Sequence, residues 1–255
     1  MVNAYSGARK LGAAIYLKSL APIKVGEFVS DFQERWPATS CEAEDSEPAV
    51  ACFKIGHSHI AIEARPTRVP NSLTRSVLET TLHWPSAEKD ISAHVAHIAV
   101  AASVDEGNTV ELASDLTRAV ASILAITDSL CVCWANGPAL TLRGDFLSIA
   151  GRLLRVNQSP FLLWVGVGWV PKGGLLHTKG MAQFGTSELL LGQQSAVSDE
   201  TVSYLHYLVR NVLTAENTLV EGQTVDGPTG VLKVELLKGA ATNKTGLLLL
   251  PVKPN

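Results

Sequence analysis

The segment VAHIAVAAS, residues 95–103, is apolar at almost every position. Successive side chains of a β-strand point to opposite faces of a sheet, so a strand that is apolar on both faces needs a packed layer on each side. This segment therefore predicts a strand in the middle of a sheet, covered on both faces. From Asn108 onward, apolar residues recur with the period of about 3.6 residues that is typical of a helix packed on a sheet.

The segments around this strand and helix alternate between short apolar runs and amphipathic patterns. Strands are predicted at residues 11–18, 49–55, 59–64 and 130–135. Gly56 lies in the short connection between the second and third of these strands, which indicates a hairpin. Helices are predicted at residues 25–36, after a cap at Asn71 or Ser72, and after a cap at Asp145.

A long apolar run, FLLWVGVGWV at residues 161–170, is followed by a glycine-containing break at 171–174. We expect 161–170 to be one long strand and 181–191 to be another, with Glu188 on the second. Ser198, Asp199 and Glu200 then supply a hydroxyl cap and two acidic side chains at the start of a helix. Further strands are predicted at 218–225, 231–237 and 247–252.

Taken in order, these elements predict an α+β protein. Each half reads β-α-β-β-α-β, which is the order of a ferredoxin-like unit, and we expect mainly antiparallel sheets. The two halves are residues 1–127 and 128–255, and the helix at 108–127 is expected to link them. No repeat of residues accompanies the repeated order of elements, so the sequence leaves open whether the halves are an internal duplication.

Composition and charge argue against several classes of function. The 255 residues include 21 Lys and Arg against 24 Asp and Glu, and they form no basic stripe of the kind that binds phosphate backbones. Direct binding of nucleic acid is therefore not expected. The longest apolar run, at 161–170, is about half of the roughly 20 residues that cross a membrane as a helix. Lys18 interrupts the first apolar patch, which argues against a signal peptide, and we expect a cytoplasmic protein with no membrane partner.

The residues that bear reactive or metal-binding groups match no known pattern of a site. His57 and His59 would face the same way on a strand, but no third metal ligand is identifiable. The glycines at 166–174 fit neither phosphate-binding loop pattern, and GTSEL at 185–189 lacks the second glycine of a nucleophile elbow. His97 is expected to be buried and hydrogen-bonded. The sequence thus predicts no catalytic residue, no metal site and no cofactor.

The four cysteines show no recognisable redox or zinc spacing. Cys131 and Cys133 lack the C-x-x-C arrangement, and no second pair accompanies them. Cys41 and Cys52 lie further towards the N-terminus. We expect free thiols, most of them buried.

Three stretches carry a resemblance to a known family. They are LLWVGV at 162–167, HTKGMAQFGTSELLL at 177–191 and LVEGQTVDG at 219–227, with Trp84 ahead of HVAHIAV at 94–100 as a further match. Together they resemble the core of the bacterial family catalogued as domain of unknown function 4261. The strongest section is 161–227. The family has no established activity, so the resemblance implies no catalytic residue.

The chain also resembles the immunity proteins of type VI secretion toxins. The resemblance implies a non-enzymatic protein that binds a cognate toxin, for instance a nuclease, through a complementary surface. The expected contact residues are the acidic loop with Glu42, Glu44, Asp45 and Glu47, and the rim with Thr178, Lys179 and Glu188.

Two alternatives stay open beside this interpretation. One is an enzyme whose site lies between the two halves and uses Glu188, His97 and His177. The other is a structural protein that forms homodimers through its sheet edges. The sequence does not identify the partner.

Overall fold

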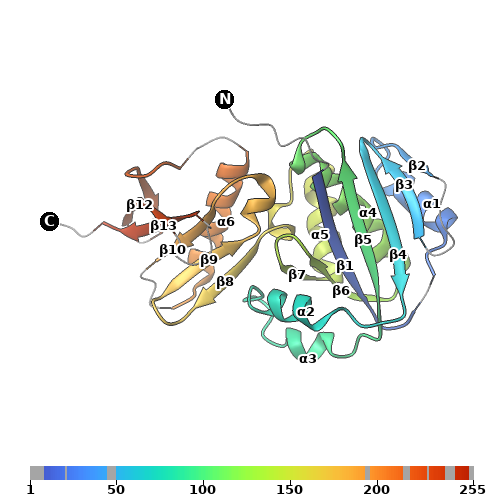
Figure 1. Cartoon of the computed structure of the whole chain (residues 1–255), viewed down its shortest axis with the longest axis horizontal. Helices are drawn as coiled ribbons and strands as arrows, with labels where there is room; N and C mark the ends of the chain where they lie inside the picture. The colour runs from blue at the N-terminus through green and yellow to red at the C-terminus, as the bar shows by residue number, and fades with distance from the viewer. Residues whose placement is uncertain are drawn as a thin grey trace.

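The computed structural model describes residues 9–20, 22–44, 50–192, 196–214, 219–228, 230–238 and 245–252. The protein is a mixed α+β structure with two sheets that lie next to each other (Figure 1). In the described ranges, the first sheet has seven strands in the order β2-β3-β4-β5-β1-β6-β7, and the second has six in the order β11-β12-β13-β10-β9-β8.

All neighbouring strands of the first sheet are antiparallel. These strands are β1 (Arg9–Leu17), β2 (Cys41–Ala43), β3 (Val50–Ile55), β4 (Ser58–Arg65), β5 (Ala96–Val104), β6 (Ser129–Trp134) and β7 (Ala139–Leu142). The predicted central strand is confirmed, because β5 lies between β4 and β1. Its cover is complete on one face only: Val100 and Ala102 are buried, whereas Ala101 on the other face is exposed.

Helices pack on both faces of the first sheet. One face carries α1 (Val25–Arg35), α4 (Thr109–Ile126) and α5 (Arg143–Leu154), and the other carries the short helices α2 (Asn71–Leu78) and α3 (Ala87–Ile91). Beneath α2 and α3 lie Tyr16, Cys131 and Cys133, and burial raises the pKa of both thiols. None of the four cysteines, which all lie in described ranges, forms a disulfide, as predicted, and three of them are buried.

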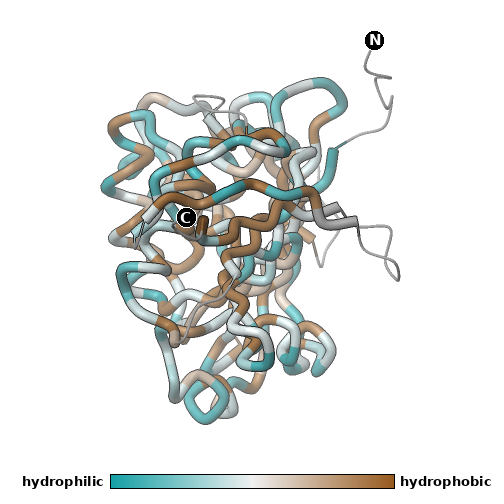
Figure 2. Tube along the Cα trace, turned by 90° about the vertical axis from the view of Figure 1, so that its left-hand side faces the viewer, coloured by the Kyte–Doolittle hydropathy of each residue, from teal (hydrophilic) through white to brown (hydrophobic). Residues whose placement is uncertain are grey.

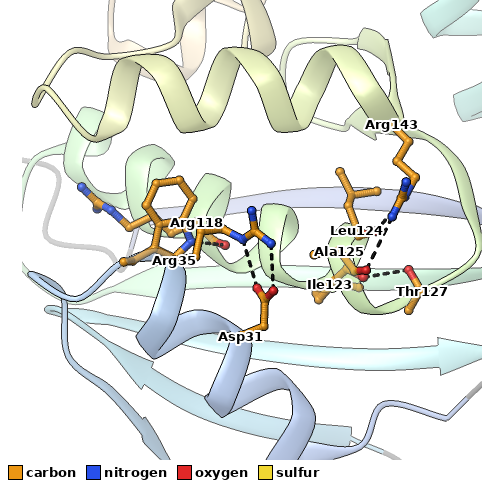
Figure 3. A network of polar contacts seen from close by, with 9 residues as sticks. Asp31, Arg35, Arg118, Ile123, Leu124, Ala125, Thr127 and Arg143 are labelled. Atoms are coloured by element: carbon orange, nitrogen blue, oxygen red, sulfur yellow. Dashed lines mark hydrogen bonds and ion pairs between the residues drawn. The ribbon is translucent and has the colours of Figure 1, made fainter.

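The long helix α4 is held at both ends by side chains. Its N-cap is Asn108, whose side-chain Oδ1 accepts a hydrogen bond from the Val110 N–H at 2.8 Å. At its other end, the Arg143 guanidinium donates to the Leu124 carbonyl at 2.8 Å, and the Thr127 hydroxyl donates to the Ile123 carbonyl at 2.7 Å (Figure 3). A helix leaves its last four carbonyls without partners, so the arginine of α5 both caps α4 and fixes α5 beside it.

The second sheet is antiparallel except where β10 pairs with β13. Its strands are β8 (Gly166–Val170), β9 (Leu175–Lys179), β10 (Glu188–Leu191), β11 (Thr224–Gly227), β12 (Gly230–Lys238) and β13 (Thr245–Pro251). The helix α6 (Asp199–Leu213) packs on this sheet, with the predicted cap at Ser198. The Ser198 side chain accepts a hydrogen bond from the Thr201 N–H, and the Thr201 side chain accepts one from the Ser198 N–H.

The ferredoxin-like halves are not confirmed. In such a unit the third strand pairs with the first, but here β1 pairs with β5 and β6, and β4 lies one strand further away. The helix at 108–127 does not link two halves, because α4 connects β5 to β6 within one sheet. The predicted division at 127/128 also differs from the division of strands, since β6 and β7 belong to the first sheet.

The expected long strands at 161–170 and 181–191 are wrong in their extent. Residues Phe161–Leu163 form the 3₁₀ helix η1, and β8 begins only at Gly166. Residues Met181–Phe184 form a second 3₁₀ helix, η2, between Gly180 (φ 121°) and Gly185 (φ 74°). Both glycines have the positive φ that other residues rarely adopt, so they start and end the turn. Periodicity cannot distinguish such short apolar turns from strands.

The larger apolar core runs through both sheets. It contains Ile98 of β5, Leu116 of α4, Leu176 of β9 and Val209 of α6. Figure 2 shows the apolar segments gathered towards the middle of the molecule. Over the part of the chain that the structure describes, no helix combines the length and apolar character needed to span a membrane.

Replacing Asn108 by Ala removes the acceptor that caps α4. We expect the free energy of unfolding, measured by urea denaturation, to fall by about 1 kcal/mol. Asn108→Asp keeps a cap acceptor and is the matched control, with an expected loss of less than half that amount. Equal losses in the two variants would contradict the role of the cap.

Candidate functional site

Two glycines meet where the sheets join. A Cβ atom on Gly137 would lie 2.0 Å from the Trp164 carbonyl oxygen, and one on Gly180 would lie 2.4 Å from the Gly137 Cα. Real Cβ atoms essentially never approach other atoms so closely. The connection between β6 and β7 can therefore touch the turn after β9 only because both positions are glycine.

Gln183 of η2 is the centre of the hydrogen bonds at this junction. Its amide NH₂ donates to the carbonyls of Trp164 and Gly180 at 2.9 and 2.8 Å, and its carbonyl accepts from the Trp134 indole at 2.9 Å. The Trp164 indole donates to the Thr117 hydroxyl of α4 at 2.8 Å. We call this set the clasp; its residues are Trp134, Gly137, Trp164, Gly180 and Gln183. The clasp ties η2 to β6 and α4, on the other side of the junction.

Glu188, which we considered as a catalytic or contact residue, has a structural role beside the clasp. Its carboxylate accepts hydrogen bonds from the Thr178 hydroxyl and the Gly180 N–H, each at 2.8 Å. The Thr178 hydroxyl oxygen in turn accepts a hydrogen bond from the Leu189 N–H at 2.8 Å. Thr178 is only 2% exposed, so its side chain offers no contact surface, contrary to the expectation from the sequence.

Lys179 connects the second sheet to the layer of small helices. Its ammonium group lies 3.0 Å from the Ser76 hydroxyl and 3.3 Å from the Glu79 carboxylate, both in or next to α2. The side chain remains partly exposed. Lys179 can therefore still reach a partner, at the cost of this ion pair.

Two of the acidic contact residues, Glu42 and Glu44, lie at the edge of the first sheet. Glu42 is exposed on β2, and Glu44 follows that strand with its carboxylate 3.1 Å from the His59 imidazole. β2 is the outermost strand, next to β3. Asp45 and Glu47 lie outside the described residues.

The residues of the expected enzymatic site are not brought together at a pocket. His97 is buried and hydrogen-bonded to the Thr67 carbonyl at 2.6 Å, which confirms the expectation for this residue. His177 lies against Gly168, where an added Cβ would be 2.7 Å from its imidazole. Neither histidine, nor Glu188, lines the cavity between the sheets. Within the described ranges, no group of three or more His, Cys, Asp or Glu side chains is placed to hold a metal ion.

A different set of residues forms a cavity of about 330 Å³ at the junction, which we call the inter-sheet pocket. It lies where the edge strands β7 and β8 face each other, with α5, α6 and the α2–α3 connection around it (Figure 1). Its walls are mostly apolar side chains, contributed by Leu82, Ala139, Leu140, Ile149, Leu162, Leu163, Val165, Val167, Val197 and Val202. This volume falls at the lower end of the range for small-molecule sites.

The titratable groups of the pocket come from two helix starts and two histidines, and Thr80, Thr141 and Ser148 add hydroxyl groups. Asp145 lies in the first turn of α5 and Asp199 in the first turn of α6, and His83 and His206 complete the set. Burial, together with the smaller effect of the nearby His83, lowers the pKa of His206 to about 4. His206 is therefore a neutral imidazole near pH 7.

Sequence reasoning missed His83 and His206, and it assigned Asp145 and Asp199 only to helix starts. A signal was present in α6, because Asp199, Val202 and His206 recur at helical spacing and so share one face. Nothing local to the sequence indicated that this face meets β7 and β8. The missing information is the contact between the two sheets.

Comparison of the chain with protein-family models, with curated proteins and with solved structures found no match. The resemblance to domain of unknown function 4261 therefore depends only on the residues quoted for it. The site has to be interpreted from its own geometry.

Gly137→Ala places a methyl group against the Trp164 carbonyl oxygen. We expect the free energy of unfolding in urea to fall by about 3 kcal/mol, because the atoms on both sides are backbone and cannot move away cheaply. Gly151→Ala is the matched control, since Gly151 lies within α5 with open space around it. Alanine there should raise the stability by about 0.5–1 kcal/mol. Similar effects at both glycines would contradict the clasp.

The low pKa of His206 predicts a loss of stability in acid. The unfolded chain binds a proton at this imidazole below about pH 6.5, whereas the folded chain resists it until about pH 4. Stability should therefore fall as the pH drops through this window, by roughly 1–3 kcal/mol once the remaining solvent contact of the ring is allowed for.

The measurement is urea denaturation at pH 7 and pH 4.5 for the wild type and for His206→Gln. The variant should lose less stability between the two values than the wild type does. His57→Gln is the control, because His57 is an exposed histidine of the β3–β4 turn and does not line the pocket. Equal pH dependence of wild type and His206→Gln would contradict the assignment.

Proposed function

We propose that this chain is an immunity protein that binds a cognate type VI secretion toxin and neutralises it by protein contact. The residues of the family resemblance support this interpretation. Thr178, Gly180, Gln183 and Glu188 all belong to its strongest section; Gly180 and Gln183 contact the first sheet, and Thr178 and Glu188 form hydrogen bonds within the second sheet beside that contact. Residues that hold the structure together are not free to bind a partner, so we expect the toxin to bind another part of the surface.

The observation that carries the proposal is the edge at β2, which pairs with β3 on one side and with no other strand in the described part of the chain. The Glu44 N–H donates to the Cys52 carbonyl, and the Gly56 N–H donates to the Ser40 carbonyl. Hydrogen-bonded and non-hydrogen-bonded pairs alternate along an antiparallel ladder, so Glu42 also faces β3, whereas Ala43 directs its N–H and C=O outward. An unpaired strand edge is a template for an added strand from another protein.

The charge at this edge suits a basic partner. Glu42 is exposed in the middle of β2, and Glu44 stands at its end. Acidic side chains beside an open strand would attract a basic segment and speed its association, mainly at low salt. A nuclease toxin, which carries basic residues for its own substrate, fits this description.

The test is calorimetry with the toxin encoded next to this chain. We expect binding at micromolar concentration or below, and a loss of at least tenfold in affinity for Ala43→Pro, because proline removes the outward N–H donor. The fold should survive, since proline is tolerated on edge strands where its missing N–H faces solvent. Ala43→Val keeps the donor and should bind nearly as the wild type does.

A second pair of variants separates charge from backbone pairing. Glu42→Lys should lower the association rate, whereas Glu88→Lys, at an exposed acid of α3, should not. Absence of binding at micromolar concentration would overturn the proposal. Equal affinity of Ala43→Pro and Ala43→Val would move the contact away from β2. A homodimer formed by pairing of two β2 edges would appear as a doubled solution mass without the toxin, and it would be broken by Ala43→Pro.

The inter-sheet pocket favours a second candidate function, an enzyme with its site between the two sheets. Its acid–base groups would be Asp145, Asp199 and His206 in place of Glu188, His97 and His177. The pocket lies away from the β2 edge. The double variant Asp145→Asn, Asp199→Asn alters the pocket and should therefore leave toxin neutralisation intact. The immunity function and the pocket can therefore be tested separately.

A further inference from the structure

The inter-sheet pocket has the walls of a ligand site. Leu140 and Leu163 are 1% exposed, and together with Val167 and Ile149 they give it a largely apolar interior. The body of a ligand that filled it would have to be apolar, because few polar groups of the walls could replace its hydrogen bonds to water.

The charges of the pocket have one sign. Asp145 and Asp199 are its carboxylates, and neither forms an ion pair with any residue that the structure describes. Among the described residues that line it, none is a lysine or an arginine. The two helix starts would by themselves suit an anion, since each carries about half a positive charge. Two full negative charges exceed that contribution, so the rim is negative.

His206 does not offset this charge. It lies on the same face of α6 as Asp199 and Val202, and its burial among apolar side chains keeps the ring neutral near pH 7. A neutral imidazole has one nitrogen that accepts a hydrogen bond. The pocket thus offers two carboxylates and an acceptor to a ligand that brings donors.

From this arrangement we infer that the inter-sheet pocket binds a small organic cation, an ammonium group on an apolar body. The ammonium group lies at the rim between Asp145 and Asp199, and the apolar body enters between β7 and β8. The inference concerns another part of the molecule than the β2 edge and does not depend on the immunity function.

The test compares three probes that share one apolar body and differ in charge. They are 2-phenylethylammonium, 2-phenylethanol and 3-phenylpropanoate, each titrated into the full chain and followed by the amide NMR signals of residues such as Ala139, Val167 and Val202. We expect the ammonium probe to bind about ten times more tightly than the alcohol, and the carboxylate to bind more weakly than either.

The double variant Asp145→Asn, Asp199→Asn should reduce the affinity for the ammonium probe about tenfold, to that of the alcohol, and leave the alcohol unchanged. Glu111→Gln is the matched control, since Glu111 is an exposed acid in the first turn of α4 and does not line the pocket. It should bind the ammonium probe as the wild type does.

Three results would overturn the inference. The first is equal affinity for the three probes, the second is unchanged ammonium binding in the double variant, and the third is the absence of saturable shifts at the pocket signals. Because both aspartates are exposed, the variants are expected to fold, and an unaltered amide spectrum away from the pocket confirms it.

Discussion

The contact between Gly137 and Gly180 sets the geometry on which the rest of the molecule depends. Only glycine fits at either position, because a side-chain atom would overlap backbone on the opposite side. The approach allows Gln183 to use both donors and the acceptor of its amide, between Trp134 and Trp164. This half-buried amide is specific in a way that apolar contacts are not, since a shift of the two sheets would leave one of its hydrogen-bonding groups unpaired.

A second close approach extends this junction towards the pocket. A Cβ on Gly166 would lie 2.4 Å from the Pro138 carbonyl oxygen, and the Thr80 hydroxyl donates to the same oxygen. The start of β8 is thereby held against the turn before β7 and the end of the α2 layer. The inter-sheet pocket is a consequence of this arrangement, because two edge strands are held close without pairing along their length.

The sequence predicted the local elements better than their partners. The strand β5, the helix α4 and the cap of α6 follow from periodicity and from residues that are adjacent in the chain. The order of the strands in the sheets does not follow from the sequence, because β6 has the same apolar pattern whether it pairs with β1 or begins a second sheet. The sequence predicts strands where the turns η1 and η2 lie, since a run of three or four mainly apolar residues fits a strand and a 3₁₀ turn equally well.

For the candidate site, too, the sequence indicated local features but not which segments come together. Asp199 carries the signal of a helix start and lies in the first turn of α6, as predicted. Asp145 is not the predicted cap, because α5 begins at Arg143 after the N-cap Leu142 and Asp145 lies in its first turn. That both side chains line one pocket depends on four segments, of which the first, at Thr80, and the last, at His206, are far apart in the chain. The clasp and the close approach at Gly166 hold the segments around β7 and β8 together, and their glycines are recognisable from the sequence only as flexible positions.

Because β10 pairs with β13 near the end of the chain, the two sheets can form at different stages of synthesis. Every strand of the first sheet lies before Arg143, so that sheet can form while the rest of the chain is still being made. In the second sheet, β10 waits for residues 245–251 before it has a partner on that side, and the β11–β12 hairpin has nothing to join until then. A growing chain therefore carries the apolar edge of β10, ELLL, without its partner strand through the synthesis of more than fifty residues.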